Sequence, residues 1–496
     1  MALVAIDLGT SNSVVARIDR DQKPVPVPNL NGSMTTPSAI LFSKHGVLFG
    51  EAALNAAALE PDKLVRCWKR EMEHGAPVFT DEAGKQHTAE DLSALFLDFL
   101  IKQASQRMGE AVTEIVVTVP SDAPAPSREA TKRAAERCKV AVLGLVNEPT
   151  AAGVAYEFDK RGDAVLVVFD LGGGTLDATV LSVQSGKFRV LATGGDRKLG
   201  GSDFDRKMAR VVLDAFQQQH GFTPDLVAEP LFAFELFDKV ERAKIALSQT
   251  PRAGVTVTCN GKTVVVEFTQ PQYEALIAAE VERAMATTEA VLKAAGKTWA
   301  EVTAVVPVGA ASRTPLVQKR LKEVSGLPLK MDVEADLAVA LGAAVCGWRL
   351  KSDKGEVLVV EGRPLPVPAV KVQEAVAHPL SVLVQDLRSG AVSAVEMIAA
   401  QTPIPAERVE RFGVLYEDHP DVLISVVQGP NGAPPEKCVP IGELLLKDIP
   451  VQRGAGNRIE VRYQYDASGI IHVTVTDRVS GKSASTDLAW SGTKAA

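Results

Sequence analysis

The sequence contains one local pattern twice, and this repeat limits what the chain can fold into. In each copy an apolar run ends in an Asp-Leu-Gly turn and a second apolar run follows: Asp7-Leu8-Gly9-Thr10, and later Asp170-Leu171-Gly172-Gly173-Gly174-Thr175. The runs on either side, at 2–6, 13–18, 164–170 and 178–183, have the composition of buried strands. The repeat indicates an internal duplication that folds as two lobes of similar design.

Each loop offers what a nucleoside triphosphate needs. Glycine lets backbone N–H groups approach phosphate oxygens closely, and Mg²⁺ favours carboxylates and water. If the two lobes face each other, Asp7 and Asp170 hold a hydrated magnesium ion, and the hydroxyl groups of Thr10 and Thr175 donate to phosphate. One Asp-Leu-Gly turn is common in ordinary loops, so the prediction depends on the repeat. A third glycine turn, Gly200-Gly201, is by itself only a loop signal.

The composition excludes several classes of protein. A formal net charge of -7 and a pI near 5.7 argue against a nucleic-acid surface. The chain has no apolar run of about 18 residues, and its start lacks the basic head of a signal peptide. Its five cysteines are far apart and form no CxxC pair, so we expect neither a disulfide framework nor a zinc site. We therefore expect a cytoplasmic protein with no membrane and no nucleic-acid partner.

Length and patterning divide the chain into three parts, as expected for 496 residues at roughly 100–200 residues per domain. Residues 1–352 mix strand and helix signals, with helical apolar stripes from residue 88, at 231–248 and at 273–295. Residues 353–377 are proline-containing, lack helical periodicity and form a linker. In residues 378–490 apolar and polar side chains alternate, and Asp466-Ala467-Ser468-Gly469 joins two such runs as a hairpin, which predicts a β domain.

Two helix starts can be predicted from capping residues. Thr88 with Asp91 resembles a capping box, and Ser127 is expected to cap a helix over residues 127–138.

Several segments, in order along the first 350 residues, resemble the 70-kDa heat-shock (Hsp70) chaperone family. They are AIDLGTSNS at 5–13, LVNEPTAAGVAYE at 145–157, FDLGGGTLD at 169–177, GDRKLGGSDFD at 195–205, ERAKIALS at 241–248, VGAASRTP at 308–315 and DLAVALGAA at 336–344. The β domain matches through TPIP at 402–405, VVQG at 426–429 and residues 449–477.

The resemblance implies an α/β fold in which a two-lobed, actin/hexokinase-like ATPase domain precedes a β-sandwich peptide-binding domain. It places positive charge from Lys69 where the γ-phosphate develops negative charge; without the resemblance, Lys69 is better interpreted as a solvated surface lysine. Thr175 matches a threonine that can self-phosphorylate. The implied metal ligands are Asp7, Glu148, Asp170 and Asp177, the last also near a K⁺ site, and the implied catalytic residues are Lys69, Glu148, Asp170, Thr175 and Asp177.

The resemblance also implies a nucleotide pocket. Glu241, Lys244 and Ser248 share one helical face and would contact ribose and adenine, although a solvated Glu241–Lys244 pair fits the same spacing. Arg313 would stack beneath the adenine and Asp336 would complete that floor. The full implied set is Gly9, Thr10, Ser11, Asn12, Gly172, Gly173, Gly174, Thr175, Gly200, Gly201, Glu241, Lys244, Ser248, Gly309, Ser312, Arg313 and Asp336.

Other positions concern communication between the domains, and several depart from the family. Pro120 and Arg128 match a switch that reports ATP to the β domain.

Gly309-Ala310-Ala311-Ser312 replaces a Gly-Gly-Ser turn, so we expect weaker nucleotide affinity. Gly144 replaces an arginine that contacts the J-domain helper, which weakens the case for ordinary J-domain stimulation. Residues 357–361 and 370–374 both match the docking linker, and the extra prolines predict a longer tether with looser coupling.

The family's β domain clamps an extended apolar peptide by strand-like hydrogen bonds. By alignment Val422 lies at the deep pocket, with Phe412 and Ile424 nearby, while Ala394 and Leu415 match the pair that arches over the peptide. Alternating apolar residues also fill any sandwich core, so both interpretations stay open. The family's helical lid has no counterpart after Asp487, so a lidless form with fast peptide release is expected.

The leading hypothesis is an ATP-dependent chaperone that binds extended hydrophobic segments of unfolded proteins and is regulated by ATP hydrolysis. The implied cofactors are ATP/ADP, Mg²⁺ and K⁺; the implied partners are unfolded polypeptide, a nucleotide exchange factor and, subject to Gly144, a J-domain co-chaperone. One alternative is a small-molecule kinase of the same fold, which would lack the β domain. Another is a non-cycling, nucleotide-gated scaffold or exchange factor, against which the retained Lys69, Glu148, Asp170 and Thr175 argue.

Overall fold

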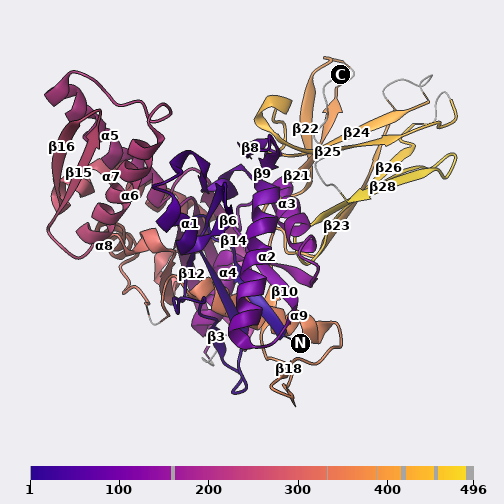
Figure 1. The fold of residues 1–496 in the computed structure, drawn as a ribbon. Coiled ribbons are helices and arrows are strands. Elements are labelled where there is room, and N and C mark those ends of the chain that lie inside the picture. Colours follow the sequence, from indigo (N-terminus) through magenta and orange to yellow (C-terminus); the bar gives the residue numbers. More distant parts are fainter. Residues whose placement is uncertain are drawn as a thin grey trace.

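The computed structural model describes residues 2–157, 162–331, 333–386, 388–414, 420–451 and 456–487. Two large sheets organise the first part of the chain (Figure 1). The first sheet has the strand order β11-β10-β1-β2-β3, with β4 paired to β2, and the second has the order β17-β12-β13-β14-β20. In each sheet the strand that carries the aspartate pairs antiparallel with the strand after the turn, β1 with β2 and β12 with β13. The repeated sequence pattern therefore builds the centre of each sheet.

The strands of the first sheet are β1 (Ala2–Asp7), β2 (Asn12–Ile18), β3 (Pro24–Pro26), β4 (Thr36–Pro37), β10 (Val112–Val119) and β11 (Ala141–Asn147). Those of the second are β12 (Ala164–Leu171), β13 (Leu176–Gln184), β14 (Lys187–Asp196), β17 (Ala304–Val308) and β20 (Lys371–Gln373). Smaller sheets pair β5 (Ala39–Ser43) with β6 (Gly46–Phe49) and β7 (Leu64–Arg66), β8 (Pro77–Thr80) with β9 (Gln86–Thr88), and β15 (Arg252–Cys259) with β16 (Lys262–Thr269).

The helices are α1 (Gly50–Ala56), α2 (Ala89–Met108), α3 (Ala125–Glu136), α4 (Glu148–Glu157), α5 (Gly201–His220), α6 (Pro230–Leu247), α7 (Gln270–Ala294), α8 (Pro315–Ser325) and α9 (Ala338–Asp353). Short 3₁₀ turns are η1 (Pro61–Lys63), η2 (Trp68–Glu71), η3 (Trp299–Glu301), η4 (Ala310–Arg313) and η5 (Pro435–Lys437).

Helices α4 and α9 pack against each other and join the two large sheets. Helix α9 contacts β1, β2 and β10 of the first sheet, and α4 contacts β12 and β13 of the second. The side chains of both helices and both sheets belong to one buried cluster. Close approach is possible because the facing residues are small: a Cβ on Gly342 of α9 would lie 1.7 Å from the carbonyl oxygen of Ala151 in α4.

We expect Gly342→Ala to be strongly destabilising, because the added methyl group has no space between the two backbones. Overpacking of this kind costs about 3 kcal/mol or more, and the melting temperature should fall by roughly 6–10 °C in calorimetry. Gly254→Ala is the matched control, since its Cβ would meet no atom within 4 Å. A melting temperature for Gly342→Ala equal to that of the control would contradict the packing described here.

The linker is packed rather than loose, so the prediction of a long tether is wrong. Strands β18 (Val359–Val360) and β19 (Arg363–Pro364) form a short hairpin, and β20 adds to the second sheet in parallel with β14. Leu358, Leu365 and Val370 are buried in the same cluster as α9. Buried apolar residues before, among and after the prolines anchor the segment. Of the two linker candidates, residues 370–374 add a strand to the second sheet, whereas residues 357–361 contribute only to the short hairpin.

The C-terminal β region consists of two four-stranded sheets around one shared core. Their orders are β22-β21-β24-β25 and β23-β26-β27-β28, and the buried side chains of both form a single cluster. The strands are β21 (Leu380–Gln385), β22 (Val392–Ile398), β23 (Ala406–Phe412), β24 (Val422–Gln428), β25 (Val439–Leu446), β26 (Ile459–Tyr465), β27 (Ile471–Asp477) and β28 (Ser483–Asp487).

The predicted elements agree with the structure in most places. The hairpin β26–β27 and the Thr88–Asp91 capping box are confirmed. The helix predicted over 127–138 is wrong at its start: α3 begins at Ala125 with Pro124 at the cap position, so Ser127 already lies in the first turn. Proline suits the start of a helix, because N–H groups there have no acceptor within the helix and the N–H that proline lacks costs no hydrogen bond. In the described part of the chain, no helix has the length and apolarity needed to cross a membrane.

Candidate functional site

Three glycine turns meet where the ends of β1 and β12 face each other. A Cβ on Gly173 would lie 2.1 Å from the Oγ of Ser11 in the first loop, and a Cβ on Gly200 would lie 2.7 Å from the backbone of Gly173. Gly9 is equally restricted, since its Cβ would lie 1.9 Å from the carbonyl oxygen of Asn12. The first two predicted loops therefore come together, and the third turn, which the sequence presented only as a loop, joins them.

A small cavity of about 90 Å³ lies among these turns. The predicted residues that line it are Asp7, Gly9, Thr10, Ser11, Asn12, Lys69, Glu148, Asp170, Gly172, Gly173, Thr175, Gly309 and Asp336. Residues distributed over more than 300 positions of sequence are thus gathered at one place.

Four carboxylates are concentrated beside this cavity. Glu148 is the first residue of α4, Asp7 and Asp170 lie on β1 and β12, and Asp177 lies on β13. Burial, and then the charge of Glu148, raise the pKa of Asp7 and of Asp177 to about 7, and the same causes hold the pKa of Asp170 well above its usual value. Such mutual repulsion in a buried place favours a cation.

Neighbouring hydroxyl groups orient two of these carboxylates. Thr118 donates a 2.7 Å hydrogen bond to Asp7, and Ser121 donates one of 2.7 Å to Asp177. The backbone N–H of Asp122 also donates to Asp177, at 2.9 Å.

Lys69 lies inside the site and is not a solvated surface lysine. Its Nζ is 2.6 Å from the Oε1 of Glu148, and both side chains are only 11% exposed. The short turn η2 holds it there, because the preceding Trp68 is buried, donates to Ser93 at 3.1 Å and packs edge-on against Phe96. Burial by itself would lower the pKa of Lys69, but the charges of Glu148 and Asp7 outweigh it and raise that pKa. The lysine therefore stays protonated.

The site residues fit a magnesium ion that is held largely through water. Among the described residues, no three His, Cys, Asp or Glu side chains are placed to hold a metal ion directly. However, the charge of Lys69 offsets only part of the charge of four buried carboxylates, and Mg²⁺ usually keeps several of its waters in proteins.

Glu241 and Lys244, two of the residues predicted to bind the nucleoside, lie beside the cavity, and each forms an ion pair with a residue of another element. Glu241 pairs with Arg66 at 3.0 Å, and Lys244 pairs with Asp205 at 2.8 Å. These four side chains line a second cavity of about 480 Å³ that also reaches Ser11 and Gly173.

The predicted adenine floor is also internally paired, since Arg313 lies 2.8 Å from Asp336. Gly309 has a positive φ of 77°, and the hydroxyl of Ser312 donates a 2.7 Å hydrogen bond to the carbonyl oxygen of Gly309. The Gly309–Ser312 turn, which departs from the family's Gly-Gly-Ser, therefore still folds tightly. Ser248 caps the end of α6. Contacts of all these residues with a nucleotide stay predictions.

Pro120 and Arg128 lie together on the side of the site that faces the C-terminal β region. The guanidinium of Arg128 donates to the carbonyl oxygen of Pro120 at 3.5 Å and to the side chain of Asn147. It also reaches the carbonyl oxygen of Ser468, at 3.4 Å, in the turn between β26 and β27. Glu374 of the linker is buried close to the same guanidinium.

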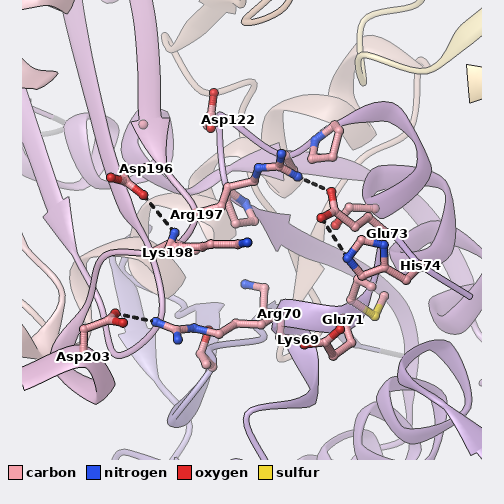
Figure 2. A pocket seen from close by; sticks show the side chains of 18 of the residues that line it. Lys69, Arg70, Glu71, Glu73, His74, Asp122, Asp196, Arg197, Lys198 and Asp203 are labelled. Carbon is pink, nitrogen blue, oxygen red and sulfur yellow. Dashed lines mark hydrogen bonds and ion pairs between the residues drawn. The ribbon is translucent and has the colours of Figure 1, made fainter. Parts of the chain in front are cut away.

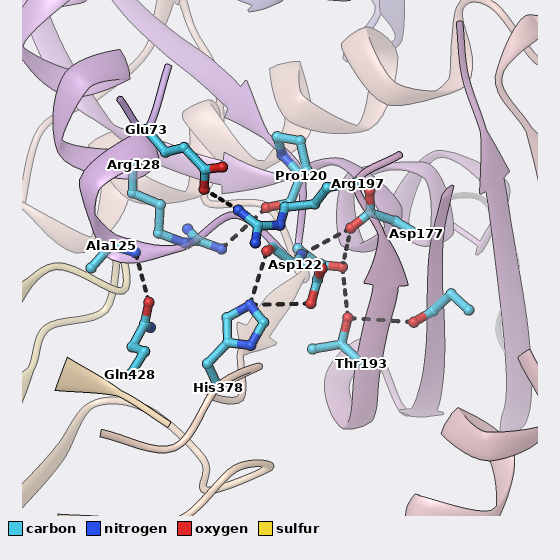
Figure 3. Close-up of polar contacts among 12 residues, drawn as sticks. Glu73, Pro120, Asp122, Ala125, Arg128, Asp177, Thr193, Arg197, His378 and Gln428 are labelled. Carbon is cyan, nitrogen blue, oxygen red and sulfur yellow. Dashed lines mark hydrogen bonds and ion pairs between the residues drawn. The ribbon is translucent and has the colours of Figure 1, made fainter. Parts of the chain in front are cut away.

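Further contacts fasten the β region to the second sheet and to the Pro120–Ala125 segment (Figure 3). Gln401 exchanges two hydrogen bonds of 2.9 Å with the backbone of Thr193 on β14. The N–H of Ala125 donates to Gln428 at 3.1 Å. The Nε2 of His378 lies 3.0 Å from the carbonyl oxygen and 3.1 Å from the carboxylate of Asp122, whose own N–H is bonded to Asp177. One line of contacts thus runs from the β region to a buried carboxylate of the site.

The His378–Asp122 contact should make docking of the β region pH-dependent. Burial and the charge of Arg197 lower the pKa of His378, but the hydrogen bond and charge of Asp122 outweigh them and raise it. Because the pKa of His378 is higher in the docked state, protonation of His378 favours docking. This stabilisation is complete below the ordinary histidine pKa of about 6.5 and is lost as the pH rises through the raised pKa. Fluorescence resonance energy transfer between one dye on the β region and one on the ATPase part should therefore be more efficient at pH 6 than at pH 8. His378→Gln should remove the difference, and an unchanged pH profile in that variant would contradict it.

The predicted peptide-binding residues lie in the sheets of the β region. Phe412 and Val422 are partly buried against its core, and Ile424 is part of that core. Ala394 is 1% exposed and packs with Val427 and Ala433. Leu415 lies outside the described residues. Contact of any of them with a peptide stays a prediction.

Several residues of the site carry no signal that sequence reasoning used. Arg70 follows Lys69 and pairs with Asp203 at 2.9 Å, so its place in the Trp68-Lys69-Arg70 segment could have marked it. Thr118, Asp122, Arg66 and His378 could not have been found, because their roles depend on contacts with distant parts of the chain.

The fold and the site define a class: a protein in which two sheets with glycine loops enclose a cluster of carboxylates and a lysine, with a β region docked beside it. The family description "Hsp70 protein" matches residues 3–495. The chain is 34% identical to the chaperone protein DnaK of Thermus thermophilus, over 97% of this chain and 79% of that protein. The chain belongs to the Hsp70 family, and it is an ATP-dependent chaperone with ATPase activity.

Proposed function

We propose that residues 1–352 form a two-lobed ATPase domain of the actin/hexokinase type, residues 353–377 a docking linker, and residues 378–490 a β-sandwich domain that binds extended hydrophobic segments of unfolded proteins. The observation that carries this proposal is the continuous set of contacts from the carboxylate cluster through Asp122 to His378. It offers a physical route by which a change at the nucleotide can alter the β domain.

In the ATPase domain, Asp7, Glu148, Asp170 and Asp177 would hold a hydrated magnesium ion, which supplies charge neutralisation for the transferred phosphoryl group. The ion pair with Glu148 keeps Lys69 charged and aimed into the site, where it would stabilise the charge that develops on the γ-phosphate. Glycine N–H groups of the three turns would bind phosphate oxygens. A K⁺ ion near Asp177 and self-phosphorylation of Thr175 remain predictions from the resemblance.

In the docked arrangement, residues of the β domain are bonded to Asp122, Ala125 and Thr193. We assign this arrangement to the state in which peptide binds weakly. Hydrolysis would release the β domain and let its sheets close on a peptide. J-domain and exchange-factor partners follow from the family, but Gly144 is covered by Ser468 here and offers no arginine to a J-domain.

Release of a fluorescent apolar peptide, measured with and without ATP, tests the proposal. Release should be at least several-fold faster with ATP and Mg²⁺ than with ADP. Equal rates in the two states would argue for a non-cycling scaffold, and phosphorylation of a sugar would argue for a kinase, which the family membership does not favour.

A further inference from the structure

A cavity of about 880 Å³ lies against the phosphate loops and has no part in the proposed chemistry so far. Its walls come from residues 69–74 and 120–127 on one side and residues 195–206 on the other. Thr10, Lys69 and Thr175 line both this cavity and the small one at the loops. The residues that would meet the γ-phosphate are thus shared between the two spaces.

The predicted nucleoside side of the site faces a different cavity, the one of about 480 Å³ described above. The cavity bounded by Glu241 and Lys244 shares Ser11 and Gly173 with the loops, and it shares neither Thr10, Lys69 nor Thr175. The loops are therefore flanked by two spaces, one at the predicted nucleoside side and one at the γ-phosphate side.

Basic side chains make the larger cavity suited to an anion. Lys198 lines it, and no acidic side chain of the described residues forms an ion pair with its amino group. Figure 2 shows this amino group pointing into the open space between Arg197 and Arg70. The buried Nε of Arg70, on the facing wall, lacks a hydrogen-bond acceptor among the described residues. A free ammonium group and an unused N–H group both suit phosphate oxygens.

Ion pairs join the facing walls of this cavity: Arg70 with Asp203, and, in a more exposed place, Glu73 with Arg197. Glu73, which follows η2, pairs with Arg197, which follows β14 (Figure 2). The arginine is 39% exposed and the glutamate 21%. Exposed ion pairs of this kind are weak and open readily, as a gate requires.

We propose that this cavity is the exit chamber for inorganic phosphate, with Lys198 as a binding contact and the Glu73–Arg197 pair as its gate. The proposal rests on the proposed function, in which water cleaves ATP to ADP and phosphate at the loops. Phosphate would then pass Thr10, Lys69 and Thr175 into the chamber while ADP is still held from the other side. At about 30 Å³ per water, the chamber has room for a hydrated ion.

Charge exchange across the gate gives the sharpest test. The protein is loaded with ADP, Mg²⁺ and radiolabelled inorganic phosphate, and the rate of phosphate loss is measured after dilution. Glu73→Arg and Arg197→Glu should each accelerate the loss by about three- to fivefold, the upper part of the range expected for an exposed pair. The double variant Glu73→Arg/Arg197→Glu rebuilds the pair in reverse and should return the rate to within about twofold of the wild type.

The two single variants change the charge of the chamber in opposite directions. A shared acceleration that the double variant cancels therefore identifies the ion pair and not the net charge. Rates unchanged in both single variants, or no restoration in the double variant, would overturn the gate.

The binding contact is tested at equilibrium with the same ligand. Lys198→Ala should weaken phosphate binding to the ADP-loaded protein about tenfold, as expected for loss of one charge-assisted contact. Lys262→Ala, on the exposed strand β16, should leave that affinity unchanged. No phosphate binding by the wild type, or equal affinities in both variants, would overturn the chamber. Acid-quenched single turnovers are measured in parallel: absence of ATP cleavage would refute the proposed function, whereas normal cleavage with negative binding results would refute only the exit chamber.

Discussion

Lys69→Ala is expected to abolish ATP hydrolysis while leaving nucleotide binding almost intact. Lys69 forms an ion pair with Glu148 inside the carboxylate cluster, with its Nζ 2.6 Å from the Oε1 of Glu148. Loss of one preorganised group that stabilises developing charge costs about 10²–10³ in rate. Binding should change by only a few-fold, since the glycine turns and the nucleoside cavity are untouched. Single-turnover hydrolysis and equilibrium nucleotide titration measure the two effects separately.

Two controls make this prediction specific. Loss of the lysine charge would raise the pKa of Asp7 further, because Lys69 now lowers it. The comparison is therefore made at pH 8, and Lys69→Gln is included to keep a polar side chain of similar length. Lys262→Ala should behave as the wild type. Parallel loss of binding and hydrolysis in Lys69→Ala would mean that the lysine holds the nucleotide and has no special place in the chemical step.

Gly144→Arg is expected to detach the β region from the ATPase part. Gly144 lies on β11, and a Cβ at this position would already lie 3.2 Å from the Oγ of Ser468 and 3.3 Å from the Cδ1 of Leu350. An arginine cannot fit into that space while the 466–469 turn is docked. The radius of gyration, about 23 Å for a compact chain of this length, should increase by several ångströms in small-angle scattering, and ATP should no longer accelerate peptide release.

The size series at this position separates crowding from other effects. Gly144→Ala adds one methyl group at a tight but tolerable distance and should have a small effect. Combining Gly144→Arg with Ser468→Gly removes one of the two obstructing side chains and should recover part of the docking. A compact Gly144→Arg protein with normal ATP-dependent release would show that the β region docks without this close contact. The arginine that the resemblance implies at this position would have to displace the side chains of Ser468 and Leu350 in the arrangement described here.

The sequence was informative wherever a function depends on a local pattern. The paired glycine loops, the strand and helix periods of the first part and the β26–β27 hairpin follow from spacing alone, because strands and turns are specified by neighbouring residues. The linker shows the limit of this reasoning. Its prolines predicted a loose tether, but Leu358 before them, Leu365 among them and Val370 after them are buried. Whether an apolar residue is buried depends on which distant surface covers it.

The sequence by itself determined the duplicated glycine loops and the division into an α/β part and a β part, and through family resemblance it predicted roles for Asp7, Lys69, Glu148 and Asp170. Tertiary structure decided how these groups are arranged: that Lys69 is buried against Glu148, that Gly144 is pressed against Ser468, and that Glu73 meets Arg197 over a large cavity. The reason is physical. A short sequence pattern specifies backbone conformation and residue type. Lys69 and Glu148 are 79 positions apart in the sequence, and Glu73 and Arg197 are 124 apart, so these contacts are set by how the sheets and helices pack.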